Sequence, residues 1–213
     1  MVDLNKYHQP SPDIKEGIPR KIEGDKEMFL AKTRVMSHLP ERADSVLDIG
    51  PACGWETKYL VEKYDGSHVT AVTLFEEEVV EIKKNSGVTA VVADMHELPF
   101  KNNRYDLVFA SHVLEHSPAP YIALSEMYRV LADKGWCFLV LPSADGYTRV
   151  DNATGSANRI GNFPAHVFCS SIETLIEMGR HVGFRFLAYH EVPQIFHGKL
   201  RYQNRIFIFR KEA

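Results

Sequence analysis

The 213-residue chain is 45% hydrophobic and 25% charged, a composition that supplies a sizeable buried core and argues against intrinsic disorder. Its 25 Lys and Arg against 28 Asp and Glu give a net charge of −3, which argues against a dedicated nucleic-acid or anionic-membrane surface. Three widely spaced cysteines favour free thiols in a reducing compartment, and no stretch approaches the roughly 18 apolar residues of a membrane span. We therefore expect one cytoplasmic domain over residues 1–213, with no membrane association.

Strand and helix signals alternate through the first two thirds of the chain. Residues 1–24 are polar and contain three prolines, which predicts an N-terminal arm, and residues 25–38 have a helical apolar spacing. In the segments that follow, strands are predicted over 45–49, 68–73, 89–93, 105–110 and 136–141, and helices over 57–64, 76–84 and 119–131. Such an alternation implies right-handed crossovers and a parallel sheet covered by helices on both faces.

The pattern changes after the fifth predicted strand. Residues 143–169 are predicted to be a long polar loop that lines a substrate pocket together with the N-terminal arm and residues 112–118. A helix over 172–182, a strand over 184–192, a connector over 193–202 and a final strand over 206–209 complete the chain. Two strands joined by a short connector predict an antiparallel hairpin added to the parallel sheet.

The most informative segment is the glycine turn that follows the first predicted strand. Ligands of open α/β sheets bind at the carboxyl ends of the strands, and Gly50 and Gly54 would let the backbone approach one there. Dinucleotide enzymes use G-x-G-x-x-G. Here Gly54 lies four residues after Gly50, and Ala52 occupies the place of the second glycine. The spacing disfavours a nucleotide-dependent oxidoreductase but leaves it open.

Four segments, in order, resemble the motifs of the class I S-adenosylmethionine (SAM)-dependent methyltransferases. They are residues 46–54, 90–100, 105–116 and 128–142. The resemblance is to the small-molecule branch that includes the ubiquinone- and menaquinone-pathway enzymes, known as methyltransferase type 11. It implies a doubly wound, Rossmann-like α/β fold with a seven-stranded, mostly parallel sheet in the order 3-2-1-4-5-7-6, whose C-terminal strand is antiparallel. It also implies SAM as the methyl donor and S-adenosylhomocysteine (SAH) as the product.

The resemblance further implies a cofactor site. The glycine turn would hold the methionine part of SAM, with Asp48 organising the turn, and Asp94 would meet the adenine amino group. Thr73 stands where most relatives have an acid that binds both ribose hydroxyls, and Glu76 or Glu77 could also reach the ribose. The full set of predicted cofactor-binding residues is Asp48, Gly50, Ala52, Gly54, Thr73, Leu74, Asp94, Met95, Ser111 and His112.

The residues that follow the fourth predicted strand could carry the chemistry. If a helix starts there, His112, Glu115 and His116 share one face, and His166 from the long loop could join them. The set could hold a divalent metal, His116 could accept a proton, or Glu115 and His116 could only tie the local helix. We predict no metal, a structural Glu115, and His116 and His166 as candidate catalytic residues, with His166 facing the substrate.

The predicted function is methyl transfer to oxygen or nitrogen of an unidentified small molecule. The methyl group of SAM is already activated, so direct displacement needs mainly in-line positioning. Nucleic acid is disfavoured as a substrate because the Asp/Asn-Pro-Pro-Tyr and Pro-Cys motifs of base methyltransferases are missing. Besides the oxidoreductase, a non-catalytic binding or partner module remains an alternative, since Ala52 and Thr73 depart from the family pattern. The oligomeric state stays open.

Overall fold

The computed structural model describes residues 32–64, 68–143, 159–160, 163–164, 167–196 and 199–212. The predicted N-terminal arm and His166 lie outside these residues, as does most of the predicted long loop. Residues 32–36 are helical, which agrees with the C-terminal part of the predicted first helix. Among the described helices, none is long and apolar enough to cross a membrane.

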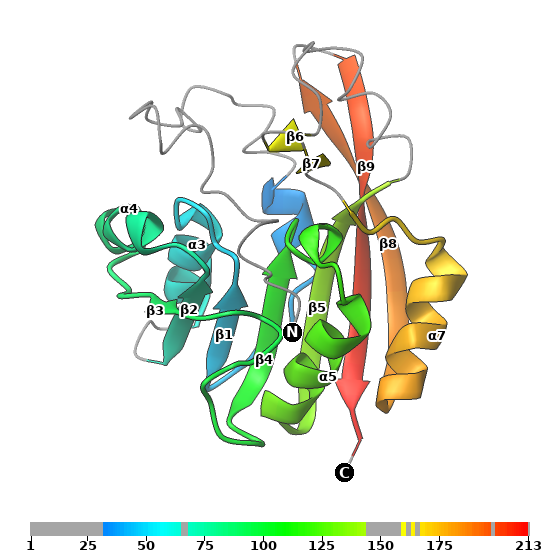
Figure 1. The fold of residues 1–213 in the computed structure, drawn as a ribbon, viewed down its shortest axis with the longest axis horizontal. Coiled ribbons are helices and arrows are strands. Elements are labelled where there is room, and N and C mark those ends of the chain that lie inside the picture. The colour runs from blue at the N-terminus through cyan, green and yellow to red at the C-terminus, as the bar shows by residue number, and fades with distance from the viewer. Residues whose placement is uncertain are drawn as a thin grey trace.

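A seven-stranded sheet in the order β3-β2-β1-β4-β5-β9-β8 forms the centre of the structure (Figure 1). Its strands are β1 (Val46–Ile49), β2 (Val69–Thr73), β3 (Val91–Val92), β4 (Tyr105–Ser111), β5 (Leu131–Pro142), β8 (Phe184–Phe196) and β9 (Lys199–Lys211). The first five pair in parallel, and β9 pairs antiparallel with both β5 and β8. Counted within this sheet, the order is 3-2-1-4-5-7-6, so the predicted fold is confirmed.

Helices cover both faces of the sheet. They are α3 (Trp55–Lys63), α4 (Glu76–Ser86), α5 (Pro120–Val130) and α7 (Ile172–Val182). Side chains of β4 alternate between two cores: Val108 packs in the core shared with α5 and α7, whereas Leu107 and Phe109 pack in the core shared with α3 and residues 32–36. Parallel strands buried on both faces explain why the predicted strands are nearly continuous apolar runs.

Local sequence signals account for the ends of the covering helices. Pro120 begins α5, where its missing N–H is not needed. The Ser171 side chain accepts a hydrogen bond from the Thr174 N–H and caps α7, which ends at Gly183 with a φ of 116°. These caps agree with the ends predicted for the last helix.

The C-terminal hairpin is longer than the sequence indicates, and the predicted connector over 193–202 is wrong. Pro193 pairs with Gln203 and Gln194 with Tyr202, so both strands continue almost to the turn. A proline is tolerated because β8 is the edge strand of the sheet. Within the predicted long loop, β6 (Arg159–Ile160) and β7 (Phe163–Pro164) form a separate antiparallel pair.

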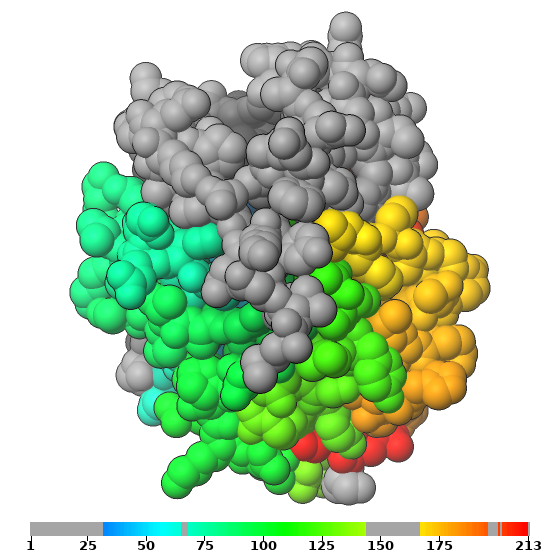
Figure 2. Space-filling view, viewed as in Figure 1, coloured from blue at the N-terminus to red at the C-terminus, as the bar shows by residue number. Residues whose placement is uncertain are grey.

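The topology defines one edge of the sheet as the place for a ligand. After β1 the chain moves outward through β2 and β3, then returns to the other side of β1 as β4. The arrowheads of β1 and β4 point to the same end of the molecule (Figure 1). In the space-filling view, α4 and α7 form opposite sides of the described surface (Figure 2). Open α/β sheets bind ligands at the carboxyl ends of the strands beside such a reversal of strand order.

Candidate active site

The turn after β1 has a backbone that few residues adopt. Gly50 and Gly54 have φ values of 71° and 82°, and Ala52 between them has a φ of 49°. Glycine takes this left-handed region without strain, whereas an alanine Cβ opposes it. The turn is therefore a specific conformation that the fold holds in place, at the position predicted for the methionine part of SAM.

The protein itself packs tightly against both glycines. A Cβ added at Gly50 would lie 2.6 Å from Cγ2 of Val113, which follows β4. A Cβ added at Gly54 would lie 2.9 Å from Cα of Ile82 and 3.2 Å from its carbonyl oxygen, both backbone atoms of α4. Internal packing therefore requires both glycines even before a ligand is considered.

Asp48 is buried beneath this turn. Its Oδ2 accepts a hydrogen bond from Oγ1 of Thr57 at 2.6 Å, and burial raises the pKa of its carboxyl to about 7. This contact joins β1 to α3 and fits the predicted organising role. Next to it, Glu56 forms an ion pair with Lys32. Burial alone would raise the pKa of the Glu56 carboxyl. The Lys32 ammonium outweighs this effect, so the net change of the pKa is downward.

Thr73 ends β2 with its side chain buried. Its hydroxyl donates a hydrogen bond to Oε2 of Glu78 at 2.5 Å, and its oxygen accepts one from the Phe75 N–H at 3.2 Å. Glu78 is 5% exposed, whereas the two glutamates named from the sequence, Glu76 and Glu77, are exposed. Sequence reasoning missed Glu78, although its i,i+4 spacing from the buried Ile82 places both on one face of α4.

Asp94 follows β3 and begins a chain of polar contacts. Its Oδ1 accepts from the His96 N–H at 2.9 Å and lies 2.5 Å from Nδ1 of the same residue. The other ring nitrogen, Nε2, lies 2.6 Å from Oγ of the buried Ser117. Met95, which lies between Asp94 and His96 in the chain, packs in the core shared with α5. Asp94 is thereby fixed to the turn after β4 through His96, which the sequence interpretation did not name.

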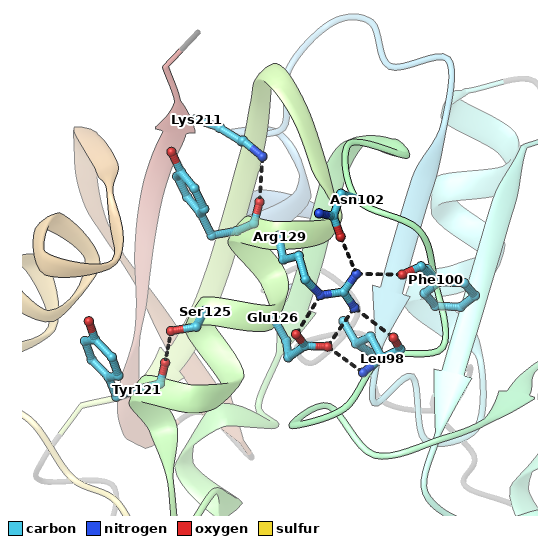
Figure 3. A network of polar contacts seen from close by, with 9 residues as sticks. Leu98, Phe100, Asn102, Tyr121, Ser125, Glu126, Arg129 and Lys211 are labelled. Atoms are coloured by element: carbon cyan, nitrogen blue, oxygen red, sulfur yellow. Dashed lines mark hydrogen bonds and ion pairs between the residues drawn. The ribbon is translucent and has the colours of Figure 1, made fainter.

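Arg129 of α5 holds the segment that follows Asp94 (Figure 3). Its Nη2 donates to the Leu98 carbonyl at 2.8 Å and its Nη1 to the Phe100 carbonyl at 2.7 Å. Glu126 accepts from Arg129 Nε at 2.7 Å and from the Leu98 N–H at 2.7 Å. The Arg129 guanidinium lowers the pKa of the Glu126 carboxyl, so the pair stays charged.

The end of β4 carries a second polar network. His112 has a φ of 53°, its Nδ1 lies 3.3 Å from Oε1 of the fully buried Glu115, and its Nε2 lies 2.8 Å from Oδ1 of Asn204 in β9. Burial lowers the pKa of the His112 imidazole, but Glu115 and Asn204 raise it, and the net change is upward. Nδ1 is thus ion-paired with a buried carboxylate, while Nε2 can donate to the amide oxygen of Asn204.

The helix that would place His112, Glu115 and His116 on one face does not form. A 3-10 turn, η3 (Leu114–His116), follows the left-handed His112, and within this segment Nδ1 of His112 forms an ion pair with Glu115. In the part of the chain that the structure describes, no group of three or more His, Cys, Asp or Glu side chains could hold a metal. The predicted absence of a metal stays a prediction, because His166 lies outside the described residues.

Both ends of the predicted substrate loop are hydrogen-bonded to the scaffold. At its start, the Ser143 N–H donates to the Gln203 carbonyl of β9 at 2.8 Å, and the Gln203 N–H donates back to the Ser143 Oγ at 3.1 Å. At its end, the Glu115 carbonyl accepts from the N–H groups of Val167 at 2.9 Å and Phe168 at 3.0 Å. The backbone of Glu115 therefore anchors the end of this segment to the turn after β4. The structural role predicted for the Glu115 side chain stays a prediction.

Comparison with known proteins points to one family. Residues 47–139 match the family model described as "Methyltransferase domain". The chain is 28% identical over 120 residues to the malonyl-[acyl-carrier protein] O-methyltransferase of Halorhodospira halophila, covering 51% of this chain and 41% of that one. It is 30% identical over 153 residues to the glycine/sarcosine/dimethylglycine N-methyltransferase of Actinopolyspora halophila, covering 67% and 25%.

The fold is also found in solved structures. The 1,6-didemethyltoxoflavin-N1-methyltransferase of Burkholderia thailandensis, solved with 1,6-didemethyltoxoflavin and SAH, is 23% identical with a TM-score of 0.68, covering 94% of this chain and 84% of that one. The chain spans less than half the length of the curated relatives it matches. The match to the methyltransferase family model favours a methyltransferase over the nucleotide-dependent oxidoreductase that the sequence had left open.

Proposed function

Because the chain belongs to the class I SAM-dependent methyltransferases, we propose that it transfers the methyl group of SAM to an oxygen or nitrogen atom of a small molecule. One observation carries the proposal: three polar features meet at the carboxyl edge of the sheet. They are the left-handed turn after β1, the Thr73–Glu78 pair after β2 and the His112–Glu115 pair after β4. Each feature is suited to a different part of the reaction.

The turn after β1 suits the methionine part of the cofactor. The nine-residue helix α3 begins directly after Gly54, and the N-terminus of a helix attracts a carboxylate. On the other side of the edge, Asp94 and Met95 are the residues proposed for the adenine ring. The contact between Asp94 and His96, together with the Arg129 clamp, would keep that segment in place when the cofactor enters.

The chemistry is a direct displacement. A lone pair of the acceptor oxygen or nitrogen attacks the methyl carbon of SAM, the carbon–sulfur bond breaks, and neutral SAH leaves. The acceptor then loses its proton to a base or to water. His112 is unsuited as that base because its Nδ1 is ion-paired with Glu115 and its Nε2 is hydrogen-bonded to Oδ1 of Asn204. His116 and His166 remain the proposed candidates.

Two relatives support a small acceptor group. By their names, one methylates an oxygen of a malonyl group carried on a protein, and the other methylates the nitrogen of glycine derivatives. Both oxygen and nitrogen are therefore acceptors among proteins similar to this chain. We propose a free small molecule as the acceptor here.

The experiment uses SAM labelled with deuterium in its methyl group. The protein is incubated with this SAM and, separately, with small-molecule, protein and nucleic-acid fractions of a cell extract, and the label is followed by mass spectrometry. Label in a small molecule, together with release of SAH, is expected. A Val80→Ala variant, altered at a side chain that is 70% exposed on α4, is the matched control and should give the same product.

Two results would contradict the proposal. Label found only in protein or nucleic acid would assign a macromolecular acceptor. SAH binding by calorimetry without label in any fraction would instead favour the non-catalytic binding module. The variant His116→Ala separates the remaining roles of this residue. If His116 is the base, the variant should lower turnover by about 10²–10⁴ and leave the SAH affinity intact. If His116 is structural, the variant should instead lower the thermal stability.

A further inference from the structure

Three side chains from two separate turns form a continuous hydrogen-bonded chain beside the edge where the cofactor would lie. Asp94 and His96 follow β3, and Ser117 lies between η3 and α5. Nδ1 of His96 lies 2.5 Å from Oδ1 of Asp94, and its Nε2 lies 2.6 Å from Oγ of Ser117. The His96 side chain is 7% exposed and Ser117 is 1% exposed, so this connection between the two turns is shielded from water.

The donors and acceptors of this chain all point in one direction. An ionised carboxylate only accepts, so the contact with Asp94 places a proton on Nδ1 of His96. In the neutral ring, Nε2 is then an acceptor, and the Ser117 hydroxyl donates to it. The Ser117 oxygen in turn accepts from the Ala119 N–H at 3.1 Å. The hydrogen bonds therefore run without conflict from the start of α5 to Asp94.

The same three residue types make up the triads of hydrolases, in which the serine is the nucleophile. Here the Ser117 side chain is buried and its oxygen already accepts the Ala119 N–H, so it is not presented to a substrate. The geometry fits a connection between two segments instead of a nucleophile.

The two ends of the connection belong to different parts of the proposed site. At one end, both the N–H and Nδ1 of His96 contact Oδ1 of Asp94, so His96 does not use the second oxygen, Oδ2. At the other end, the Ser117 N–H donates to the Leu114 carbonyl at 3.0 Å and closes η3, the turn that contains the candidate base His116. The hydrogen bonds therefore join the residue proposed for the adenine ring to the turn proposed for the acceptor.

We propose that His96 is a positioning residue that couples the two halves of the site, so that a cofactor bound at Asp94 orders the turn after β4. Because the His96 ring is buried and bonded at both nitrogens, a shift of Asp94 also shifts Ser117. Hydrogen-bond networks of this kind carry energy between sites, and such coupling typically changes affinities by about 5- to 150-fold. The inference rests on the proposed function, since it takes Asp94 as a contact of the cofactor.

Hydrogen–deuterium exchange followed by NMR tests the coupling without knowledge of the acceptor. The probes are the amides of His116 and Ser117, which donate to carbonyls within the turn. In the full chain, saturating SAH is expected to slow their exchange by at least about 5-fold, the lower end of typical coupling. Ser117→Ala keeps the contact between Asp94 and His96 but removes the link to the turn. This variant should still bind SAH and should lose the slowing.

A second variant and a control separate coupling from simple support of the fold. His96→Phe keeps a planar ring but removes both nitrogens. It should also lose the slowing, and calorimetry should show SAH binding about 2- to 10-fold weaker, the range for one net hydrogen bond. His181→Phe is the matched control, because His181 of α7 is exposed and contacts only the nearby Glu177 carbonyl among the printed sequence's described residues. It should behave as the full chain does.

Other outcomes would overturn the proposal. If the three residues only support the fold, Ser117→Ala and His96→Phe would lower the melting temperature and yet keep the SAH-dependent slowing. Labelling of Ser117 by a fluorophosphonate would make it a nucleophile instead of a link. Should His96→Phe not fold, Ser117→Ala, which removes only a hydroxyl, decides alone. A full chain that fails to bind SAH would refute the proposed function and this inference with it, whereas SAH binding without any slowing would refute the inference alone.

Discussion

Alanine substitutions at Gly54 and at Gly87 should separate two contributions to stability, the cost of a left-handed backbone and the cost of steric overlap. Gly54 has a φ of 82°, and its Cβ would meet the backbone of Ile82 at 2.9 Å. Gly87, at the end of α4, has a nearly equal φ of 79° but nothing within 4 Å of its Cβ position. Gly87→Ala therefore reports the backbone conformation alone, and Gly54→Ala reports the conformation together with the close approach of α3 and α4.

The expected magnitudes follow from these two geometries. A left-handed Cβ costs about 1–2 kcal/mol, and the reduced freedom of the unfolded alanine chain returns about 0.4–1 kcal/mol. Gly87→Ala should thus lower the free energy of unfolding by roughly 0–1.5 kcal/mol. Gly54→Ala should lose about 1–3 kcal/mol more, because backbone atoms must shift to relieve the overlap.

Urea unfolding of both variants measures the difference, which corresponds to about 2–12 °C in melting temperature for a domain of this size. The affinity for SAH should change in parallel. The overlap with Ile82 would displace the glycine turn, whose backbone is proposed to hold the methionine part of the cofactor. Gly54→Ala should therefore weaken SAH binding while Gly87→Ala does not. Equal stability losses in the two variants would refute the tight contact between α3 and α4.

Three further predictions concern neighbouring residues. Ala52→Gly should raise the free energy of unfolding, measured by urea denaturation, by up to about 1.5 kcal/mol, since glycine adopts a φ of 49° without the Cβ strain. A loss of stability would contradict this. The folded-state pKa of Asp48, about 7 against an ordinary 3.8, means that the folded chain binds the proton more tightly, so stability should fall as pH rises from about 4 to 7. Asp48→Asn should flatten this part of the curve of unfolding free energy against pH, and an unchanged slope would show that Asp48 is not its source. Arg129→Met should lower the free energy of unfolding by about 1–3 kcal/mol by leaving the Leu98 and Phe100 carbonyls without their donor; an unchanged melting temperature would contradict the clamp.

Much of the fold could be predicted because the signals that define it are local. The alternation of apolar strands and amphipathic helices gives the parallel sheet, and caps such as Ser171 and Gly183 set the ends of α7. The continuation of the hairpin through Pro193 could not be predicted in this way. It depends on β8 being an edge strand, and only the assembled sheet determines that.

The site was predictable in position but not in its contacts. Glu78 is one of three consecutive glutamates, and nothing in their order tells which one faces the sheet until the register of α4 is known. His112 was grouped with His116 on an assumed helix. Its left-handed φ instead accompanies a hydrogen bond to Asn204, a residue 92 positions away in the chain. Contacts of such long sequence separation leave no periodic pattern to read.

The hydrogen bonds at Ser143 and Glu115 also bear on how this protein can diverge. They anchor the chain on either side of residues 144–166 to strands and turns that belong to the scaffold. For a loop with fixed ends, each doubling of its length costs only about 0.6 kcal/mol in closure entropy. An insertion, deletion or graft between these anchors would therefore leave the sheet and its cofactor edge unchanged. Because this segment is predicted to line the substrate pocket, we expect acceptor preference to change with it independently of the methyl donor.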